Sequence, residues 1–256
     1  IPVISGFPGG VNVIQTPRFI LGVPSAEWRL GAFLARYGGF EFGSEKVFES
    51  LLKPGMVVID LGANLGVYTI LALQKGCEVH SFEPTPRIFN LLEEDIAVNG
   101  FEPSGMAHTY QLAITDHIGD LTFYGFSAKS GHNSIYKNVE SDYEVKVKSD
   151  TLDHVLGDLH QIDFIKMDIE GAELAALNGM TNILNANPDL KIIMEFGPEN
   201  MVAASVDPSV VIDWLRSRGF SWKVINEQSG ELEDWTDSQL LGAFSVNLLL
   251  QRSFNG

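Results

Sequence analysis

The stretch Val57-Val58-Ile59-Asp60-Leu61-Gly62-Ala63-Asn64-Leu65-Gly66 decides the fold that we predict for this chain. It is an apolar run that ends in an acid and two glycines, and an amphipathic segment follows it. Glycine lets the backbone pass close beneath a ligand, and the first turn of the following helix presents unpaired N–H groups. Glu83, at the end of the next predicted strand, supplies an acceptor for ribose hydroxyls. The pattern predicts a site for a nucleoside-bearing cofactor.

The composition limits the size of the fold and the class of partner. The chain has 256 residues, of which 45% are hydrophobic and 20% are charged. This is enough apolar material for one large core, so we expect a single α/β domain over residues 1–256. The formal net charge of −16 opposes binding to a phosphate backbone, so no nucleic-acid partner is expected.

Cysteine use and apolar runs bear on the compartment. The single cysteine, Cys77, excludes an intramolecular disulfide and every Cys-x-x-Cys motif, and we expect it to be reduced between a helix and a strand. No apolar run reaches the roughly 18 to 20 residues needed to span a bilayer. The first residues lack a basic region followed by an apolar one. We therefore expect a cytoplasmic protein with no membrane partner.

From residue 56 onward, apolar strand patterns alternate with helical ones, which is typical of parallel βαβ units. Helices are predicted at 67–75, 86–99, 172–178 and 210–218. Seven sheet strands are predicted, at 56–60, 78–82, 110–115, 162–168, 190–195, 221–226 and 243–251. The last two strands are expected to follow one another without a helix, so they should form an antiparallel hairpin.

Two segments fall outside this alternation. Residues 1–50 have helical spacing at 27–37 and 45–52 and are expected to form an N-terminal cap on the core of residues 51–256. Residues 116–150 form an insertion, with strand patterns at 120–124 and 143–148 around a polar loop that contains His132. An insertion after a parallel strand tends to lie over the carboxyl edge of the sheet, so this loop is a candidate substrate site.

The glycine spacing separates two kinds of nucleotide-binding sheet. Dinucleotide oxidoreductases usually carry Gly-x-Gly-x-x-Gly directly after the first strand. Here Gly62 and Gly66 are the only glycines of the turn, Asn64 holds the middle place, and Val67 stands where the third glycine would be. The pattern disfavours a nicotinamide-dependent oxidoreductase.

A second stretch, Phe164-Ile165-Lys166-Met167-Asp168-Ile169-Glu170-Gly171-Ala172-Glu173, carries a family resemblance. Asp150-Thr151-Leu152-Asp153 precedes it and Ile193-Met194-Glu195 follows it. Together with Asp60 to Asn64, these segments resemble the FkbM family of S-adenosylmethionine-dependent methyltransferases over residues 45–197. The resemblance implies a Rossmann-like α/β fold, with a seven-stranded, mostly parallel sheet, a C-terminal antiparallel hairpin and an N-terminal cap. It also implies methyl transfer from S-adenosylmethionine.

The same resemblance implies a set of cofactor-binding residues. Asp60, Gly62, Asn64 and Gly66 would surround the methionine portion of S-adenosylmethionine, and Glu83 would bind the ribose diol. Two residues at the end of the third predicted strand, Ala113 and Ile114, would border the adenine.

The charged strand can also be interpreted without the family. Period two puts Phe164, Lys166 and Asp168 on one face of a central strand, where charges are costly unless they are paired or stand at its end. In the functional interpretation, Asp168 or Glu170 orients the methyl acceptor or takes its proton, and Lys166 tunes their charge. In the structural interpretation, Asp168 caps the next helix and Lys166 is its ion-pair partner.

Glu195 ends another strand and can belong to the same edge. The candidate bases are therefore Asp168, Glu195 and His132, in that order. An alcohol acceptor needs such a base more than an amine does, because an amine titrates closer to neutral pH. Asp168 and Glu195 are also oxygen ligands of the kind that divalent cations prefer, but no two-His motif or third ligand fixes a metal site, so no metal is expected.

The preferred function is O-methylation of a hydroxyl on a small molecule, such as a secondary metabolite or a sugar. N-methylation of an amine or amide is the close alternative. A nicotinamide-dependent oxidoreductase and a non-catalytic module that keeps the cofactor pocket are the other classes considered.

Overall fold

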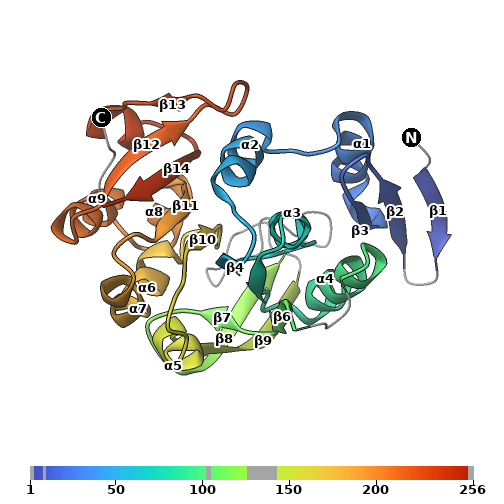
Figure 1. Ribbon diagram of the computed structural model, residues 1–256, viewed down its shortest axis with the longest axis horizontal. Helices are drawn as coiled ribbons and strands as arrows, with labels where there is room; N and C mark the ends of the chain where they lie inside the picture. Colours follow the sequence, from blue (N-terminus) through green and yellow to red (C-terminus); the bar gives the residue numbers. More distant parts are fainter. Residues whose placement is uncertain (1–2, 8–9, 102–104, 126–142, 253–256) are drawn as a thin grey trace.

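A twisted eight-stranded sheet forms the centre of the molecule. The computed structural model describes residues 3–7, 10–101, 105–125 and 143–252 (Figure 1). The strand order is β13-β12-β14-β11-β10-β4-β5-β6. The strands are β4 (Val57–Leu61), β5 (Glu78–Phe82), β6 (Ala107–Tyr110), β10 (Phe164–Met167), β11 (Lys191–Phe196), β12 (Ser221–Ile225), β13 (Leu232–Glu233) and β14 (Val246–Gln251). The five strands from β11 to β6 are parallel, and β14, β12 and β13 pair antiparallel.

Helices cover both faces of this sheet. Helices α3 (Val67–Gln74) and α4 (Pro86–Val98) contribute to one core cluster. Other helices contribute to the second core cluster. They include α5 (Leu152–Leu156), α6 (Glu173–Asn178), α7 (Thr181–Ala186), α8 (Pro198–Ala203) and α9 (Pro208–Ser217). Strand β10 follows the predicted alternation, since Phe164 enters the first cluster whereas Ile165 and Met167 enter the second.

The predicted third strand at 110–115 is wrong in its extent. β6 ends at Tyr110, where the N–H of Leu112 turns back to donate to the Tyr110 carbonyl at 2.9 Å. The chain then leaves the main sheet, and β7 (Ala113–Ile114) pairs with β9 (Tyr143–Asp150) in a separate sheet of order β7-β9-β8. β8 (Gly119–Gly125) and β9 are the two strands expected in the insertion.

The predicted seven-stranded sheet and helix-free hairpin at the C-terminus are also wrong. β12 and β14 are antiparallel neighbours, but β13 and α10 (Asp237–Leu241) lie between them in the chain. β13 pairs with β12 and becomes the eighth strand of the sheet. α10 begins with a capping box, in which Thr236 and Gln239 satisfy each other's backbone N–H groups.

The N-terminal segment contains both expected helices and a sheet that the sequence did not predict. The helices are α1 (Trp28–Tyr37) and α2 (Phe42–Leu51), so the second begins three residues before the predicted 45–52. β1 (Val3–Phe7), β2 (Val11–Gln15) and β3 (Ile20–Pro24) form an antiparallel sheet at one end of the molecule (Figure 1). A short 3-10 turn (Ser25–Glu27) leads from β3 into α1.

Polar side chains of α4 and of its C-cap residue hold β3. The backbone N–H of Gly22 donates to Asp95 at 2.6 Å. The Asn99 amide accepts from the N–H of Ile20 at 2.9 Å and donates to its carbonyl at 2.7 Å. Asn99 therefore pairs with Ile20 as a neighbouring strand would.

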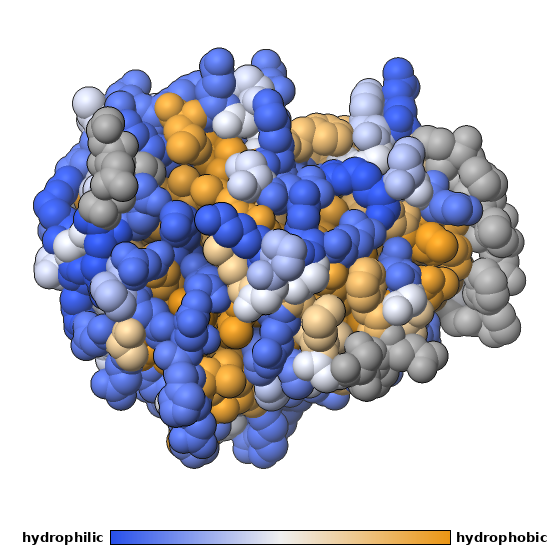
Figure 2. Space-filling view, viewed as in Figure 1, coloured by the Kyte–Doolittle hydropathy of each residue, from blue (hydrophilic) through white to orange (hydrophobic). Residues whose placement is uncertain are grey.

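The surface is largely hydrophilic in the view of Figure 2, where apolar side chains lie in small groups between polar ones. In the described ranges, none of the helices has both the length and the apolar character required to cross a bilayer. Cys77 is buried between α3 and β5, in the predicted place, with its thiol 3.4 Å from the carbonyl of Lys53.

Candidate active site

A cavity of about 620 Å³ opens at the carboxyl ends of β4, β5, β10 and β11. Its wall includes most of the residues proposed from the sequence, namely Asp60, Gly62, Asn64, Glu83, Ala113, Ile114, Lys166, Asp168 and Glu195. Gly66 lies behind the wall, at the start of α3. His132 lies outside the described residues. Most of the residues proposed from the sequence therefore meet in one cavity, and the role of each stays a prediction.

The turn after β4 depends on its glycines. Gly62 has a φ of 79° and Gly66 a φ of 85°, both in the left-handed region that favours glycine. A Cβ at Gly62 would lie 1.9 Å from the carbonyl oxygen of Asp168, so the turn and the end of β10 touch through their backbones. A Cβ at Gly66 would lie 2.7 Å from Leu92. Asn64 also takes a positive φ, 49°, which asparagine tolerates better than most residues.

Glu83 is held firmly at the cavity wall. Its carboxylate accepts the N–H of Thr85 at 2.9 Å and the Thr85 hydroxyl. The side chain is buried, and burial raises its pKa. Ala113 and Ile114 supply apolar wall nearby, from β7 rather than from the main sheet. A glycine turn, a fixed carboxyl group and an apolar wall suit an amino-acid tail, a ribose and an adenine, which are the parts of S-adenosylmethionine.

Asp60 lines the cavity and also forms a buried hydrogen bond within the core. Its carboxylate accepts the hydroxyl of Thr69 at 2.6 Å, and that hydroxyl also lies 2.7 Å from Ser81. Burial raises the pKa of Asp60 to about 6. The aspartate thus ties the first turns of α3 to the end of β4.

Three acids meet at the other side of the cavity. Carboxylate oxygens of Asp168, Glu170 and Glu195 all lie within 4.8 Å of one another. Asn200 donates to Glu170 at 2.6 Å, and the Ser245 hydroxyl donates to Glu195 at 2.6 Å. Burial, followed by the charge of Asp168, raises the pKa of Glu170 to about 10 and that of Glu195 to about 9. Burial and the neighbouring carboxylate thus favour the neutral form of both glutamates.

Lys166 is the cation of this cluster. Its side chain is only 1% exposed, its Nζ lies 3.5 Å from Asp168, and it stands 4.9 Å from the centroid of the Tyr68 ring. Burial alone would lower the pKa of Lys166, but the surrounding carboxylates, Asp168 first, raise it above its usual range. The lysine is therefore charged, both as the ion-pair partner of Asp168 and as a source of positive potential at the cavity.

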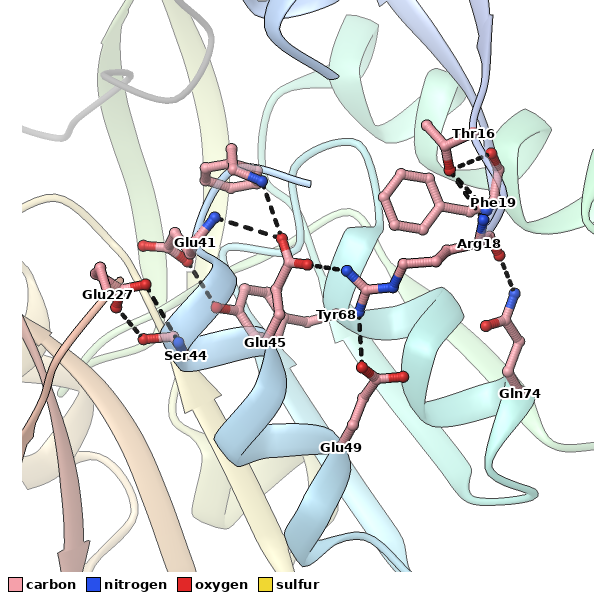
Figure 3. Close-up of polar contacts among 11 residues, drawn as sticks. Thr16, Arg18, Phe19, Glu41, Ser44, Glu45, Glu49, Tyr68, Gln74 and Glu227 are labelled. Carbon is pink, nitrogen blue, oxygen red and sulfur yellow. Dashed lines mark hydrogen bonds and ion pairs between the residues drawn. The ribbon is translucent and has the colours of Figure 1, made fainter. Parts of the chain in front are cut away.

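Glu41 and Tyr68 are cavity residues that the sequence analysis missed. The Tyr68 hydroxyl donates to Glu41 at 2.7 Å, and Asn247 of β14 donates to the other oxygen at 2.8 Å (Figure 3 shows the tyrosine contact). Burial raises the pKa of Glu41. No local pattern connects residue 41 with residues 68 and 247, so only the packing of the cap on the sheet reveals the contact.

Ion pairs and hydrogen bonds hold α2 beside this site. Arg18 reaches Glu45 and, at 2.7 Å, Glu49, while Glu227 accepts from the backbone and side chain of Ser44 (Figure 3). The helix is therefore fixed on one side by the turn between β2 and β3 and on the other by the loop after β12.

The outer wall comes from segments whose part in the site was less clear from the sequence. Trp28, Arg29 and Leu34 of α1 line the cavity, as does Phe40 after that helix. Phe123 of β8 also lines it, so the insertion does reach the site. The polar loop proposed within the insertion falls in the undescribed range 126–142.

Comparisons with known proteins agree with this geometry. The model of the methyltransferase FkbM domain matches residues 60–222. The hexuronic acid methyltransferase AglP of Haloferax volcanii is 28% identical over 187 residues, which cover 71% of this chain and 72% of AglP. The methyltransferase sdnD of Sordaria araneosa is 26% identical over 202 residues, covering 66% of this chain and 77% of sdnD.

The fold comparison points in the same direction. A TehB-like SAM-dependent methyltransferase from Corynebacterium glutamicum superposes with a TM-score of 0.50 at 13% identity, covering 88% of this chain and 94% of that one. At this identity the likeness concerns the fold, which is α/β and Rossmann-like. Because the family model spans most of the chain, from Asp60 at the glycine turn through the charged strand to β12, this protein belongs to the FkbM family and is an S-adenosylmethionine-dependent methyltransferase.

Proposed function

We propose that this enzyme methylates a hydroxyl group of a small molecule, such as a sugar or a secondary metabolite. The observation that carries the proposal is the acidic cluster beside the glycine turn, because an alcohol must lose its proton to become a good nucleophile. The relative AglP, named for a hexuronic acid, supports an acceptor of the sugar class.

In this proposal one half of the cavity holds the cofactor. The methionine portion of S-adenosylmethionine is held by Gly62 and Asn64, with Asp60 behind them. Gly66, the residue just before α3, lies beneath this part of the cofactor. Glu83 accepts hydrogen bonds from the ribose, and Ala113 and Ile114 border the adenine. When bound, S-adenosylmethionine supplies an activated methyl group on a sulfonium centre.

The other half prepares the acceptor. Asp168 takes the proton of the hydroxyl, and Lys166 stabilises the charged form of Asp168 through their 3.5 Å contact. Glu195 and Glu170, whose neutral forms are favoured, orient the acceptor by donating hydrogen bonds. Holding reacting groups at near-attack distance can contribute roughly 7 to 11 kcal/mol to a rate enhancement. The main work of the protein is therefore alignment and proton removal.

The chemical bond in the product tests the proposal. The enzyme is incubated with a mixed sugar and metabolite extract and with S-adenosylmethionine that carries a carbon-13 methyl group. The labelled product is then examined by NMR before and after mild alkali. A methyl ether, stable to alkali, is the expected product. A methyl group on nitrogen would support the N-methyltransferase alternative instead, and an alkali-labile methyl ester would show that a carboxylate is the acceptor atom.

A further inference from the structure

The solvent-exposed face of α1 is aromatic and basic, whereas the chain as a whole is acidic. The exposed residues of this helix recur at positions i, i+1, i+4, i+5, i+8 and i+9, so they form one stripe along its axis. They are Trp28, Arg29, Ala32, Phe33, Arg36 and Tyr37. The stripe has two bases and no acid, in a chain with 33 acidic and 17 basic residues. We call these six residues the α1 strip.

The aromatic rings of the α1 strip are exposed and grouped. Trp28 is 62% exposed and Tyr37 is 52% exposed. The ring centroids of Phe33 and Tyr37 are 4.6 Å apart, and Phe42 at the start of α2 lies 6.3 Å from Phe33. Large apolar side chains that gather on a surface usually mark a binding site.

Both arginines of the α1 strip are stacked on its rings. The guanidinium of Arg29 lies 5.4 Å from the centroid of Trp28, and that of Arg36 lies 5.2 Å from the centroid of Tyr37. Neither arginine forms an ion pair with an acid of the described chain. Each guanidinium is thus positioned by an aromatic ring, with its donors available to an anion from outside.

The α1 strip continues into the cavity. Trp28 and Arg29 belong to it and also line the cavity wall, and Phe40, which is 42% exposed, adds to the wall beyond the helix. Arg29 and Arg36 are seven residues apart, which is about 10 Å along a helix axis. A ligand that contacts both arginines is therefore longer than one sugar ring and extends outward from the site of methyl transfer.

We propose that the α1 strip binds an anionic, carbohydrate-like extension of the methyl acceptor, with its acidic groups on Arg29 and Arg36 and its rings against Trp28 and Tyr37. The inference rests on the proposed small-molecule acceptor and narrows its class to an acidic saccharide or a conjugate of one. Charge complementarity supports the inference. A chain of net charge −16 repels an anionic ligand unless cationic side chains, here Arg29 and Arg36, lie where the ligand enters. A second copy fits less well, since a symmetric contact through this face would bring four arginines together.

A charge assay on the products tests the inference even while the acceptor is unidentified. The enzyme is incubated with a sugar extract and labelled S-adenosylmethionine, and the products are separated on an anion exchanger. We expect the labelled product to be retained. We expect the double variant Arg29→Gln, Arg36→Gln to raise the KM for the purified acceptor at least tenfold, with less than a twofold change in cofactor Kd.

Arg218→Gln is the matched control. Arg218 is an exposed arginine at the C-terminal end of α9, and its guanidinium lies 5.0 Å from the centroid of the Trp214 ring. It does not line the cavity. This variant should keep the wild-type KM. A labelled product that passes the exchanger as a neutral molecule, or an unchanged KM in the double variant, would overturn the inference.

A direct binding measurement gives a second readout. Calorimetry with trigalacturonate and with neutral maltotriose should show binding of the acidic trisaccharide that the double variant loses. Equal behaviour of the two probes would overturn the inference, as would a wild-type dimer that the double variant converts to monomers. An N-methylated but anionic product would contradict the proposed O-methylation and leave the α1 strip assignment standing.

Discussion

Asp168 is the side chain on which the proposed chemistry depends most, because it lies between the buried Lys166 and the carboxyl groups of Glu170 and Glu195. Asp168→Asn keeps the shape of the side chain and removes its ability to take a proton. Loss of a positioned base typically costs a factor of 10² to 10⁴, so we expect kcat to fall by about that much. Cofactor affinity, measured by calorimetry, should change less than about threefold. Equal losses in both quantities would mean that the residue is structural.

Glu83 should show the opposite pattern. In Glu83→Gln the amide keeps an acceptor for Thr85 but weakens the bonds offered to a ribose diol. We expect the Kd for S-adenosylmethionine to rise about tenfold, which corresponds to about 1.4 kcal/mol, with kcat at saturating cofactor little changed. Glu78→Gln, at the other end of β5, is the control. Unchanged affinity in Glu83→Gln would refute the ribose assignment.

Glu195 should make the stability of the protein depend on pH. Its folded pKa of about 9 exceeds the ordinary value of 4.5, so between these values the folded state holds more protons than the unfolded state. Stability contributed by the protonated form is therefore lost as pH rises through this window. Glu195→Gln cannot ionise, and its carbonyl can still accept from Ser245.

We accordingly expect Glu195→Gln to be stabilised relative to the wild type by about 1 to 3 kcal/mol at pH 8 and by much less at pH 5. Urea unfolding at both pH values measures the difference. The exposed Glu199→Gln should show no such dependence. A constant difference across the range would argue against a Glu195 that is protonated in the folded state.

At the scale of elements, the Asn99 amide is one of two side chains that attach β3 to α4 and its C-terminal end. Asn99→Ala would leave both backbone groups of Ile20 without their partner. Because each lost partner of a backbone group costs about 1 to 3 kcal/mol, we expect a loss of at least 1 to 3 kcal/mol in the free energy of unfolding. Asn182→Ala, an exposed asparagine of α7, should stay within about 0.5 kcal/mol of the wild type. Equal effects of the two substitutions would contradict the strand-like role of Asn99.

The elements that the sequence predicts well are those with a long-range apolar signature. Strands β4, β10 and β11 are mostly apolar because both their faces are covered, and the few charges within or just after β10 and β11 identified Lys166, Asp168 and Glu195. The break between β6 and β7 was missed because the residues from Tyr110 to Thr115 are apolar enough for one strand, and only the turn at Leu112 separates them.

Other features depend on contacts that no local pattern encodes. Strands β2 and β3 lie outside the strand–helix alternation that marks the core, and β3 is held by the side chains of Asp95 and Asn99. Glu41 and Arg29 join the cavity only because the cap packs over the edge of the sheet. The capping box at Thr236 and Gln239 was a usable signal for α10, and recognising it would have predicted the helix in the tail.

At the scale of the whole molecule, self-repulsion should limit stability at low ionic strength. The net charge is −16, and the Debye length falls from about 30 Å at 0.01 M salt to about 8 Å at 0.15 M. Screening weakens repulsion among like charges, so the thermal midpoint at pH 7.5 should rise over this range. Choline chloride should act like sodium chloride if general screening is the cause. A lower midpoint in both salts would mean that the ion pairs contribute more than the repulsion.

The contact between Gly62 and the Asp168 carbonyl bears on how enzymes of this architecture diverge. A main-chain contact sets the closest approach between the turn after β4 and the end of β10, so substitutions at positions other than Gly62 leave that contact in place. The part of the wall formed by α1 consists of side chains, which single substitutions can change one at a time. New acceptors can therefore be adopted by exchanging the outer wall, while the path of methyl delivery is inherited unchanged.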